Sequence, residues 1–498
     1  MHWENGRSAG LLPYARRHLL FAIVRGRTER LANRGKTTEE LDKRTPVALF
    51  ASMSPIESTT ARKRVALLSA ASEIHHEPGA VWLDSALAVG DRGHRSFLAQ
   101  NPSGELILDA RGLRCTLNGR DLTTPSHLWP ELLERTCRDW PGYAIGFISY
   151  EASLPWLAPD LPTPNDSLPL VHFYFYDTAL IADHDADEST GDSRKSTPRY
   201  GRMKTGRDEL PESDEPRRPV RQARAICRRA DYVEKVRLIK HHIHEGDIYQ
   251  ANFTTRIDVG SAMDPWQVYR RLRERSPAPY SAWMNFGDYQ VVSSSPERMF
   301  RRRSGAITTG PIKGTIAAGN NDEERVQNRQ RLLNSEKDRA ELLMIVDLER
   351  NDLGRIAETG SVRVDELYRA EQYSTVTHLA SDISARLQGG LGYADIFRAL
   401  LPGGSITGAP KKRAVEIISE LESVPRGIYT GAIGYIHGDR ADFNLAIRTM
   451  VHQDGQWRVH AGGGIVADSD PESEWREMKL KASAMLRSLG VAEEEVEW

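Results

Sequence analysis

Cysteine, long apolar runs and net charge are all scarce in this sequence. Its 498 residues include 3 cysteines, an odd number without a CxxC pair, which disfavours a disulfide framework and a zinc knuckle and fits a reducing cytoplasm. The longest apolar run near the N-terminus, residues 19–24, is too short for a membrane-spanning helix or a signal-peptide core. The 67 basic residues nearly balance the 69 acidic ones, and the formal charge of −2 predicts neither a nucleic-acid nor a membrane partner.

Apolar and charged residues are distributed so that the chain divides into four parts. Residues 1–62 are rich in arginine and lack sustained periodicity, which predicts a loosely ordered extension. Residues 63–182 contain runs dense in β-branched and aromatic residues, typical of buried strands. Over 183–226, 20 of 44 residues are charged, 10 of each sign, which predicts a mobile loop or linker. Residues 227–498 alternate strand-like and helix-like segments, so the fold class is α/β or α+β.

The first of two acidic helices is predicted over residues 335–346. This run is apolar enough to predict a buried helix, yet Asp338 and Glu341 share one of its faces at i, i+3. Buried carboxylates need partners. The residues alone leave two interpretations open: Ser335 and Asp338 form a capping box while Glu341 pairs with an arginine, or the carboxylates bind a ligand.

The second acidic helix is predicted over residues 470–481. Asp470 is placed to cap it, and capping chemistry also accounts for acidic residues in its first turn. Capping does not account for Glu477 and Lys481, which continue the face that starts at Glu474. If the two acidic helices converge, their carboxylates form an oxygen-rich site suited to Mg²⁺, and the lysine meets an anionic substrate.

Two glycine-rich stretches accompany these helices. Residues 402–411 precede a helical run and offer backbone amides to an anion, but Ala409 and Pro410 stand where a P-loop requires Lys and Ser or Thr. Residues 461–466 end a predicted hairpin and allow a ligand to approach the backbone closely. Either stretch taken alone is more often a turn than a site.

The predicted hairpin has a strand over 443–451, a turn at Asp454-Gly455 and a second strand over 456–461. Arg448 lies on the polar face of the first strand. It either faces water or offers its guanidinium to a substrate carboxylate beside the glycines.

The ordered motifs of the chain resemble those of the chorismate-utilising enzymes, a family that includes the anthranilate, aminodeoxychorismate, isochorismate and salicylate synthases. The motifs are PIKGT (311–315), SEKDRAELLMIVDLERNDLG (335–354), VTHLAS (376–381), PGGSITGAPKKRA (402–414), IRT (447–449) and AGGGIVADSDPESEWRE (461–477). Earlier segments, WLDSA (82–86) and GFISYE (146–151), look like the family's N-terminal half. The resemblance implies two antiparallel β-sheets packed as a sandwich with flanking helices, the N-terminal part completing a shared core.

The resemblance also implies a role for each motif residue. Glu341 and Glu477 would bind Mg²⁺, with Asp338 and Glu474 helping directly or through water. Further contacts would surround chorismate: Arg448, Tyr435 and the Gly463 amide at the enolpyruvyl carboxylate, Lys481 at the ring carboxylate, Ser405 in the glycine-rich loop, and Gln250. These roles favour the ligand interpretation of the acidic helices over capping alone.

A few positions distinguish the branches of the family. Isochorismate and salicylate synthases carry a water-activating lysine where this chain has Gln250, so ring hydroxylation is disfavoured. Anthranilate synthases usually read PIAGT, whereas Lys313 of PIKGT is the signature of the aminodeoxychorismate branch and would add to C2 of chorismate. Glu297 matches the family's general acid, with an ion pair to Arg298 as the alternative, and His378 would give an orienting hydrogen bond.

The chain lacks its own source of ammonia. Its cysteines lie in LRCTL, RTCRD and AICRR, not in the G-x-C-x-G turn of an amidotransferase, so a separate glutamine amidotransferase subunit is expected. Because the chain ends at Trp498 without a fused lyase, a separate aminodeoxychorismate lyase is expected to release 4-aminobenzoate for folate synthesis. The competing hypotheses are an anthranilate synthase component and a non-catalytic, amino-acid-sensing partner of a glutaminase.

A second ligand site is also implied by the resemblance. Ser85, Pro279 and Tyr280 match the elements that form an amino-acid pocket, for tryptophan, in this family. This chain reads Leu-Asp-Ser where Leu-Glu-Ser is commoner, which puts feedback regulation in doubt. Plain core packing is the alternative.

Overall fold

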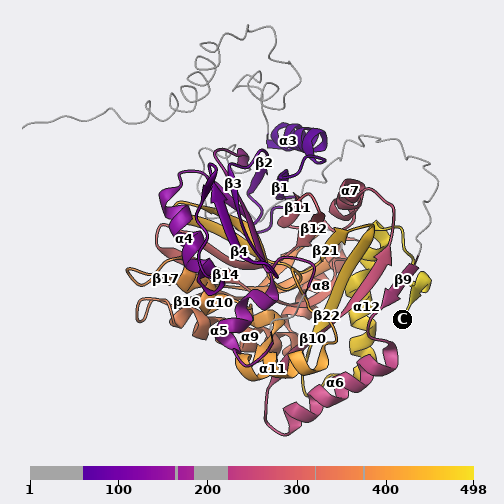
Figure 1. The fold of residues 1–498 in the computed structure, drawn as a ribbon. Coiled ribbons are helices and arrows are strands. Elements are labelled where there is room, and N and C mark those ends of the chain that lie inside the picture. The colour runs from indigo at the N-terminus through magenta and orange to yellow at the C-terminus, as the bar shows by residue number, and fades with distance from the viewer. Residues whose placement is uncertain (1–59, 163–165, 184–221, 320, 374–375) are drawn as a thin grey trace, which may run out of the picture. The chain divides into compact units, whose positions relative to one another are not determined.

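Runs of β-branched and aromatic residues build two large β-sheets, which carry most of the fold (Figure 1). The structure is a computed structural model that describes residues 60–162, 166–183, 222–319, 321–373 and 376–498. These residues belong to one compact unit that starts at Thr59. Nearly all of the predicted extension and most of the predicted linker lie outside the described residues. The described ends of the linker are strand, at Asp183 and at Gln222–Ala225.

The first sheet has 11 strands in the order β23-β9-β10-β22-β21-β12-β11-β1-β2-β8, with β18 paired to β10. Its strands are β1 (Val81–Asp84), β2 (Arg95–Ala99), β8 (Leu180–Asp183), β9 (Gln222–Ala225), β10 (Gln250–Gly260), β11 (Tyr280–Asn285), β12 (Tyr289–Ser295), β18 (Gly408–Ala409), β21 (Thr449–Gln453), β22 (Gln456–Ile465) and β23 (Val496–Glu497). Strands from both halves of the chain therefore complete this sheet.

The second sheet has 12 strands in the order β15-β17-β14-β13-β20-β19-β6-β7-β3-β4-β5, with β16 paired to β17. Its strands are β3 (Gly104–Asp109), β4 (Gly112–Leu117), β5 (Arg120–Asp121), β6 (Tyr143–Ile148), β7 (Val171–Tyr176), β13 (Arg298–Arg303), β14 (Ala306–Gly310), β15 (Ile312–Ala317), β16 (Arg363–Gln372), β17 (Val376–Arg386), β19 (Ala432–His437) and β20 (Arg440–Leu445). Among the described strands of both sheets, only the short β9–β23 pair is parallel.

The two sheets share an apolar layer, so the predicted sandwich is confirmed. Phe147 and Tyr176 of the second sheet pack in one cluster with Met284 and Val291 of the first. A second apolar cluster joins the second sheet to helices α4, α9 and α10. Burial of both faces explains why β6 and β7 are apolar nearly throughout.

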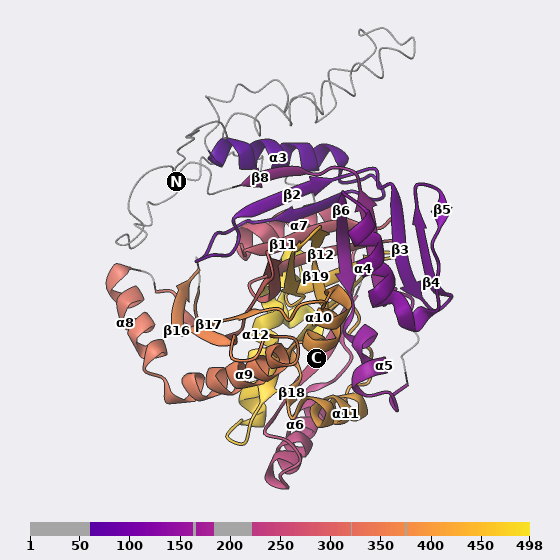
Figure 2. The same ribbon diagram turned by 90° about the vertical axis from the view of Figure 1, so that its left-hand side faces the viewer.

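Helices cover the outer faces of the sandwich, as two views at right angles show (Figures 1 and 2). They are α3 (Thr60–Ile74), α4 (Trp129–Asp139), α5 (Leu154–Leu157), α6 (Arg229–His244), α7 (Pro265–Arg275), α8 (Asp322–Leu333), α9 (Glu336–Gly354), α10 (Tyr393–Leu400), α11 (Lys411–Leu421) and α12 (Pro471–Ser488). In Figure 2, α3 lies above β2 and β8, and α9 lies on the opposite side of the strands. In the described part of the chain, no helix is long and apolar enough to cross a membrane.

Both acidic helices predicted from the sequence are present. The Ser335 hydroxyl caps α9 by accepting from the Asp338 amide at 3.3 Å, and Asp470 caps α12 through its side chain. The expectation that the first helix is buried holds for one face only, because Leu342 is fully buried whereas Leu343 is 49% exposed.

The single strand predicted over 443–451 is wrong. β20 ends at Leu445 in the second sheet, and β21 begins at Thr449 in the first. Arg448 lies in the crossing between them with φ 50°. Polar–apolar alternation has the same period in either sheet and cannot reveal where a chain changes sheets. The predicted turn at Asp454-Gly455 is present, with φ 51° and 74°, and joins β21 to β22.

A second crossing lies beside the first. The chain passes from β12 in the first sheet to β13 in the second, and Glu297 lies in this connection. The Leu445 amide donates to the Glu297 carbonyl at 3.0 Å, and the Ser294 amide donates to the Arg448 carbonyl at 3.0 Å. The paired crossings therefore bring Glu297 and Arg448 to the same end of the sandwich.

Candidate active site

The motif residues come together from elements that are far apart in the sequence. They are Glu297 before β13, Lys313 on β15, Glu341 on α9, His378 on β17, Ser405 in the short 3₁₀ helix Gly404–Ile406, Gly463 on β22, and Glu474, Glu477 and Lys481 on α12. Their contacts and mutual charge interactions define one site.

A β-bulge sets the position of Lys313. The pairing of β15 with β17 shifts register between Lys313 and Thr315, and Gly314 takes φ 70°. A Cβ on Gly314 would lie 2.9 Å from side-chain atoms of Asp338. The glycine of the PIKGT motif thus allows β15 to approach α9, which carries the acidic residues.

Ser405 connects the lysine to the predicted acid. The Lys313 amine donates to the Ser405 carbonyl at 3.0 Å, and the Ser405 hydroxyl donates to a Glu297 carboxyl oxygen at 2.7 Å. Burial raises the pKa of Glu297, and desolvation lowers the pKa of Lys313. Both shifts favour the uncharged forms, a carboxylic acid and a free amine, which are the forms that a proton donor and a nucleophile require.

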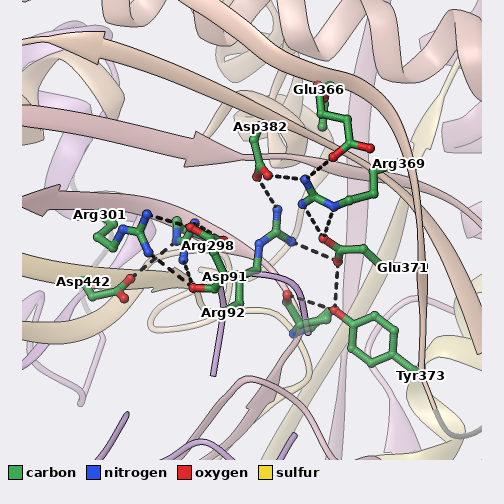
Figure 3. A network of polar contacts seen from close by, with 12 residues as sticks. Asp91, Arg92, Arg298, Arg301, Glu366, Arg369, Glu371, Tyr373, Asp382 and Asp442 are labelled. Atoms are coloured by element: carbon green, nitrogen blue, oxygen red, sulfur yellow. Dashed lines mark hydrogen bonds and ion pairs between the residues drawn. The ribbon is translucent and has the colours of Figure 1, made fainter. Parts of the chain in front are cut away.

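Arg298 is not the partner of Glu297. Its guanidinium donates to Asp91 at 2.9 Å, in a network of arginines and carboxylates that Figure 3 shows. In the same network the fully buried Arg92 binds Glu371 at 3.2 Å and Asp382 at 2.9 Å. Arg298 is therefore paired with Asp91 and does not form the ion pair considered as an alternative for Glu297.

His378 is neutral and has a free ring nitrogen. Its Nδ1 and the Thr315 hydroxyl share a hydrogen bond of 2.8 Å, while Nε2 is buried without a partner among the described residues. Burial, followed by the charge of Arg448, lowers the pKa of His378 to about 3. The Nε2 atom is thus available to a bound substrate.

Arg448 has no acidic partner within the described chain. In the described part of the chain its guanidinium donates a hydrogen bond to the Ser276 hydroxyl at 3.4 Å, and burial lowers its pKa. A desolvated guanidinium without a carboxylate is suited to a carboxylate supplied by a ligand.

The acidic residues of the two helices form an open, oxygen-rich edge of the site. Glu477 and Lys481 pair at 2.8 Å, with side chains 53% and 46% exposed. A Cβ on Gly463 would lie 3.3 Å from Glu474, 3.4 Å from the Lys481 amine and 4.0 Å from Glu477. Burial raises the pKa of Glu341, and the charges of Asp338 and Glu477 raise it further.

The donor set fits a hard cation, although the described residues contain no preformed group of three or more metal-ligating side chains. All the candidate ligands are carboxylates, and Glu477 raises the pKa of both Glu341 and Glu474. Mg²⁺ accepts one or two protein carboxylates and completes its shell with water and substrate oxygens. A cation here would relieve the repulsion among these carboxylates.

The two remaining predicted substrate contacts, Gln250 and Tyr435, lie in surroundings that differ from each other. Gln250, at the start of β10, has a buried Nε2 that no described residue hydrogen-bonds, 3.1 Å from where a Cβ on Gly464 would lie. Tyr435 instead packs its ring on Phe97 at 4.3 Å between centroids and lines a separate cavity. Its predicted contact with the enolpyruvyl carboxylate stays a prediction, and Arg448 does not line the cavity that Tyr435 lines.

That separate cavity brings together the residues predicted for an amino-acid pocket. Ser85, Pro279 and Tyr280 all line it, and its volume is about 240 Å³. Asp84 of the Leu-Asp-Ser motif accepts from the Tyr269 hydroxyl at 2.8 Å and pairs with Arg273. The acidic residue of this motif is therefore held by α7.

Sequence reasoning missed several residues that shape the active site. Thr315 and Ser276 are ordinary hydroxyl residues, and the partners Arg92 and Glu371 are separated by 279 positions. Thr315 could have been found from the sequence, because it belongs to the PIKGT motif. The others carried no signal, because their roles depend on long-range contacts.

Comparisons with known proteins show the family of this chain. Residues 86–487 match the family of chorismate binding enzymes. Aminodeoxychorismate synthase component 1 of Salmonella typhimurium is 38% identical over 433 residues, 84% of this chain and 94% of that protein. The protein of the same name from Bacillus subtilis is 36% identical over 74% of this chain and 82% of its own. Anthranilate synthase component 1 of Pseudomonas aeruginosa is 45% identical over 55% of this chain and 56% of its own.

Solved structures give the same result for the fold. Anthranilate synthase component I from Streptococcus pneumoniae matches with a TM-score of 0.64 and 28% identity, covering 89% of this chain and 98% of that one. The menaquinone-specific isochorismate synthase of Escherichia coli, at 19% identity, shares the fold with a TM-score of 0.61 over 84% of this chain and 91% of its own. The chain belongs to the chorismate-binding enzyme family.

Proposed function

We propose that this protein is the chorismate-aminating subunit of an aminodeoxychorismate synthase, which replaces the 4-hydroxyl of chorismate by ammonia. The observation that supports this reaction is the desolvated amine of Lys313, linked through Ser405 to the carboxyl of Glu297. A nucleophile and an acid with opposite pKa shifts suit displacement of a hydroxyl group.

The reaction proceeds by two displacements. The Lys313 amine bonds to C2, and both ring double bonds shift, from C1=C2 to C1=C6 and from C5=C6 to C4=C5. The C4–O bond breaks at the same time, while Glu297 gives its proton to the departing oxygen, which leaves as water. Ammonia then bonds to C4, both double bonds shift back, and the bond between C2 and Lys313 breaks. The configuration is retained because ammonia enters C4 from the face that the hydroxyl left, and the enolpyruvyl group stays on the ring.

The remaining residues hold and orient the substrate. Arg448 and the Gly463 amide bind the enolpyruvyl carboxylate, and Lys481 binds the ring carboxylate. His378 donates or accepts one orienting hydrogen bond through Nε2. Glu341 and Glu477, helped by Asp338 and Glu474, would hold a Mg²⁺ ion, which neutralises the ring carboxylate when bound.

Loss of a metal carboxylate should change the Mg²⁺ requirement. We expect Glu477→Gln to raise the Mg²⁺ concentration for half-maximal activity at least about tenfold, because one negative oxygen donor is lost. Titration with Mg²⁺, and with Mn²⁺ by calorimetry, measures this. Glu472→Gln is the matched control on α12, since Glu472 pairs with Arg229 at the surface. An unchanged requirement in Glu477→Gln would remove this residue from the metal site.

Ammonia comes from a separate glutamine amidotransferase subunit in this proposal, and a separate lyase consumes the product. The support is that the two relatives matched over most of their length are each named component 1, and that the described Cys115, Cys137 and Cys227 are all buried. The cavity around Ser85, Pro279 and Tyr280 is proposed as the amino-acid pocket.

Identification of the product tests the proposed function. Purified protein is incubated with chorismate, Mg²⁺ and ammonium, with and without an aminodeoxychorismate lyase, and the aromatic product is identified by mass and fluorescence. We expect 4-aminobenzoate only when the lyase is present. Anthranilate without lyase would instead assign the chain to the anthranilate synthase branch, which the Pseudomonas aeruginosa relative represents. Absence of any chorismate consumption would support a non-catalytic role.

A further inference from the structure

A small polar cavity adjoins the catalytic acid. It has a volume of about 20 Å³, and Glu297, Thr309, Glu349 and Ser405 are among the residues that line it. A site of this size holds about one water when polar partners surround it. The Gly404 backbone lies against the Glu349 side chain, since a Cβ on Gly404 would be 3.6 Å from Cγ of Glu349.

Glu349 and Thr309 are neighbours in this cavity. One carboxyl oxygen of Glu349 and the Thr309 hydroxyl are buried without a hydrogen bond of normal geometry among the described residues, although the two groups are close enough for Thr309 to lower the pKa of Glu349. Lys411, whose charge acts on Glu349, is already paired with Asp352 at 2.6 Å. A buried polar atom without a partner costs free energy unless water or a second function compensates for it.

Charge and burial around Glu349 favour its protonated form. Burial raises the pKa of Glu349 to about 8, and the charges of Glu297 and Asp352 raise it further, against the effects of Thr309 and Lys411. The residue is half-buried on α9, whereas Glu297 is only 5% exposed. The raised pKa therefore favours the protonated form of Glu349 at neutral pH, and the residue as a whole is more exposed than Glu297.

The proposed amination needs a group that returns a proton to Glu297 after each turnover. Each turnover transfers one proton from Glu297 to the departing hydroxyl and leaves a buried carboxylate. The nucleophile does not need to return this proton, because Lys313 is released as a free amine and ammonia keeps its hydrogens as the ammonium of the product. Glu297 must therefore regain a proton from another source before the next turnover.

We propose that Glu349 supplies the proton that regenerates Glu297, through one water in the shared cavity. The O–H bond of Glu349 breaks, the water passes a proton on, and an O–H bond forms on Glu297; solvent then reprotonates Glu349. This inference rests on the proposed function. Because Glu349 acts through Glu297 and does not touch the substrate, it is a positioning residue for the proton and not a catalytic residue.

Pre-steady-state kinetics of Glu349→Gln test this proposal. The amide has the shape and neutrality of the protonated acid but cannot release a proton. With chorismate, Mg²⁺ and ammonium, we expect the first product per active site to form at the wild-type rate and later turnovers to slow about tenfold to hundredfold. The KM for chorismate should stay within about twofold of the wild-type value, because Glu349 contributes no substrate contact.

The pH profile gives a second readout. At a fixed concentration of free ammonia, wild-type kcat should fall as pH rises through about 8, where Glu349 loses its proton. The Glu349→Gln variant should lack this decrease. Thr309→Val removes the hydroxyl that faces the cavity and should slow the same later turnovers to a smaller extent. If Glu349→Gln unfolds at a lower temperature than the wild type, Thr309→Val provides the test instead.

Asp347→Asn is the matched control, because Asp347 lies on the same helix with a side chain 77% exposed, and its kinetics should equal the wild type. Wild-type steady-state turnover in Glu349→Gln would overturn the role of Glu349 alone. An equal slowing of the first turnover would also overturn it, in favour of a structural role. Failure of the wild type to form 4-amino-4-deoxychorismate would overturn the proposed function and this inference with it.

Discussion

Replacing Lys313 by alanine is expected to lower kcat at least about a thousandfold, which corresponds to about 4 kcal/mol of activation free energy. The variant loses the atom that bonds to C2, so neither displacement can take place. Without ammonia, wild-type protein incubated with chorismate should gain the mass of chorismate less one water, located on Lys313 by peptide mapping. Lys313→Ala should gain none.

Two variants distinguish a nucleophile from a simple positive charge. Lys313→Arg keeps a cation but offers no free amine, and it should be as inactive as Lys313→Ala. Lys412→Ala removes an exposed lysine of the adjacent motif and should leave kcat unchanged. Substantial activity in Lys313→Arg would show that charge is sufficient and would contradict the covalent reaction.

Replacing Glu297 by glutamine is expected to lower kcat about a hundredfold to ten-thousandfold, the usual contribution of a general acid. The amide preserves the shape of the group and can still accept from the Ser405 hydroxyl, so the KM for chorismate should change little. Steady-state kinetics with saturating ammonium measure both constants.

The step affected by Glu297 can also be observed directly. Because the C4 hydroxyl leaves without a proton in Glu297→Gln, the covalent adduct on Lys313 should accumulate more slowly by the same factor as kcat. Glu297→Asp retains an acid at greater distance and should recover part of the rate, whereas Glu323→Gln, an exposed carboxylate on α8, should have no effect. Wild-type adduct formation in Glu297→Gln would transfer the acid role to another residue.

The reaction depends on both groups being uncharged at the same time. A charged pair, Lys313⁺ with Glu297⁻, has the same net charge as the neutral pair, so no proton has to enter or leave the protein to exchange one for the other. Burial disfavours both charges, which raises the pKa of Glu297 and lowers that of Lys313. Both shifts move the pair toward its neutral form, which is the reactive one in the proposed reaction.

Local features of the sequence predicted much of this molecule correctly. The caps of α9 and α12 could be predicted because a capping hydrogen bond joins residues three positions apart, such as Asp470 and Ser473. The turn at Asp454-Gly455 could be predicted because two residues with positive φ define it. The motif order indicated the family, and with it the sandwich that the two sheets confirm.

Other features could not be predicted because they depend on contacts between distant segments. The predicted strand over 443–451 failed because β20 and β21 belong to different sheets, which alternation cannot distinguish. The packing of Tyr435 on Phe97 could not be predicted for a related reason: Phe97 comes from the other sheet. Neither partner gives a local signal for the other.

The sequence by itself therefore determined the two acidic helices, their caps, the hairpin turn and the family, because each depends on residues close together in the chain or on their order. Only the tertiary structure decided that Glu297 and Arg448 start from paired crossings between sheets, that Ser405 links Glu297 to Lys313, and that Glu349 shares a cavity with the acid. These contacts arise from packing of segments about 50 to 150 residues apart, where burial and the exclusion of water set the pKa of each group.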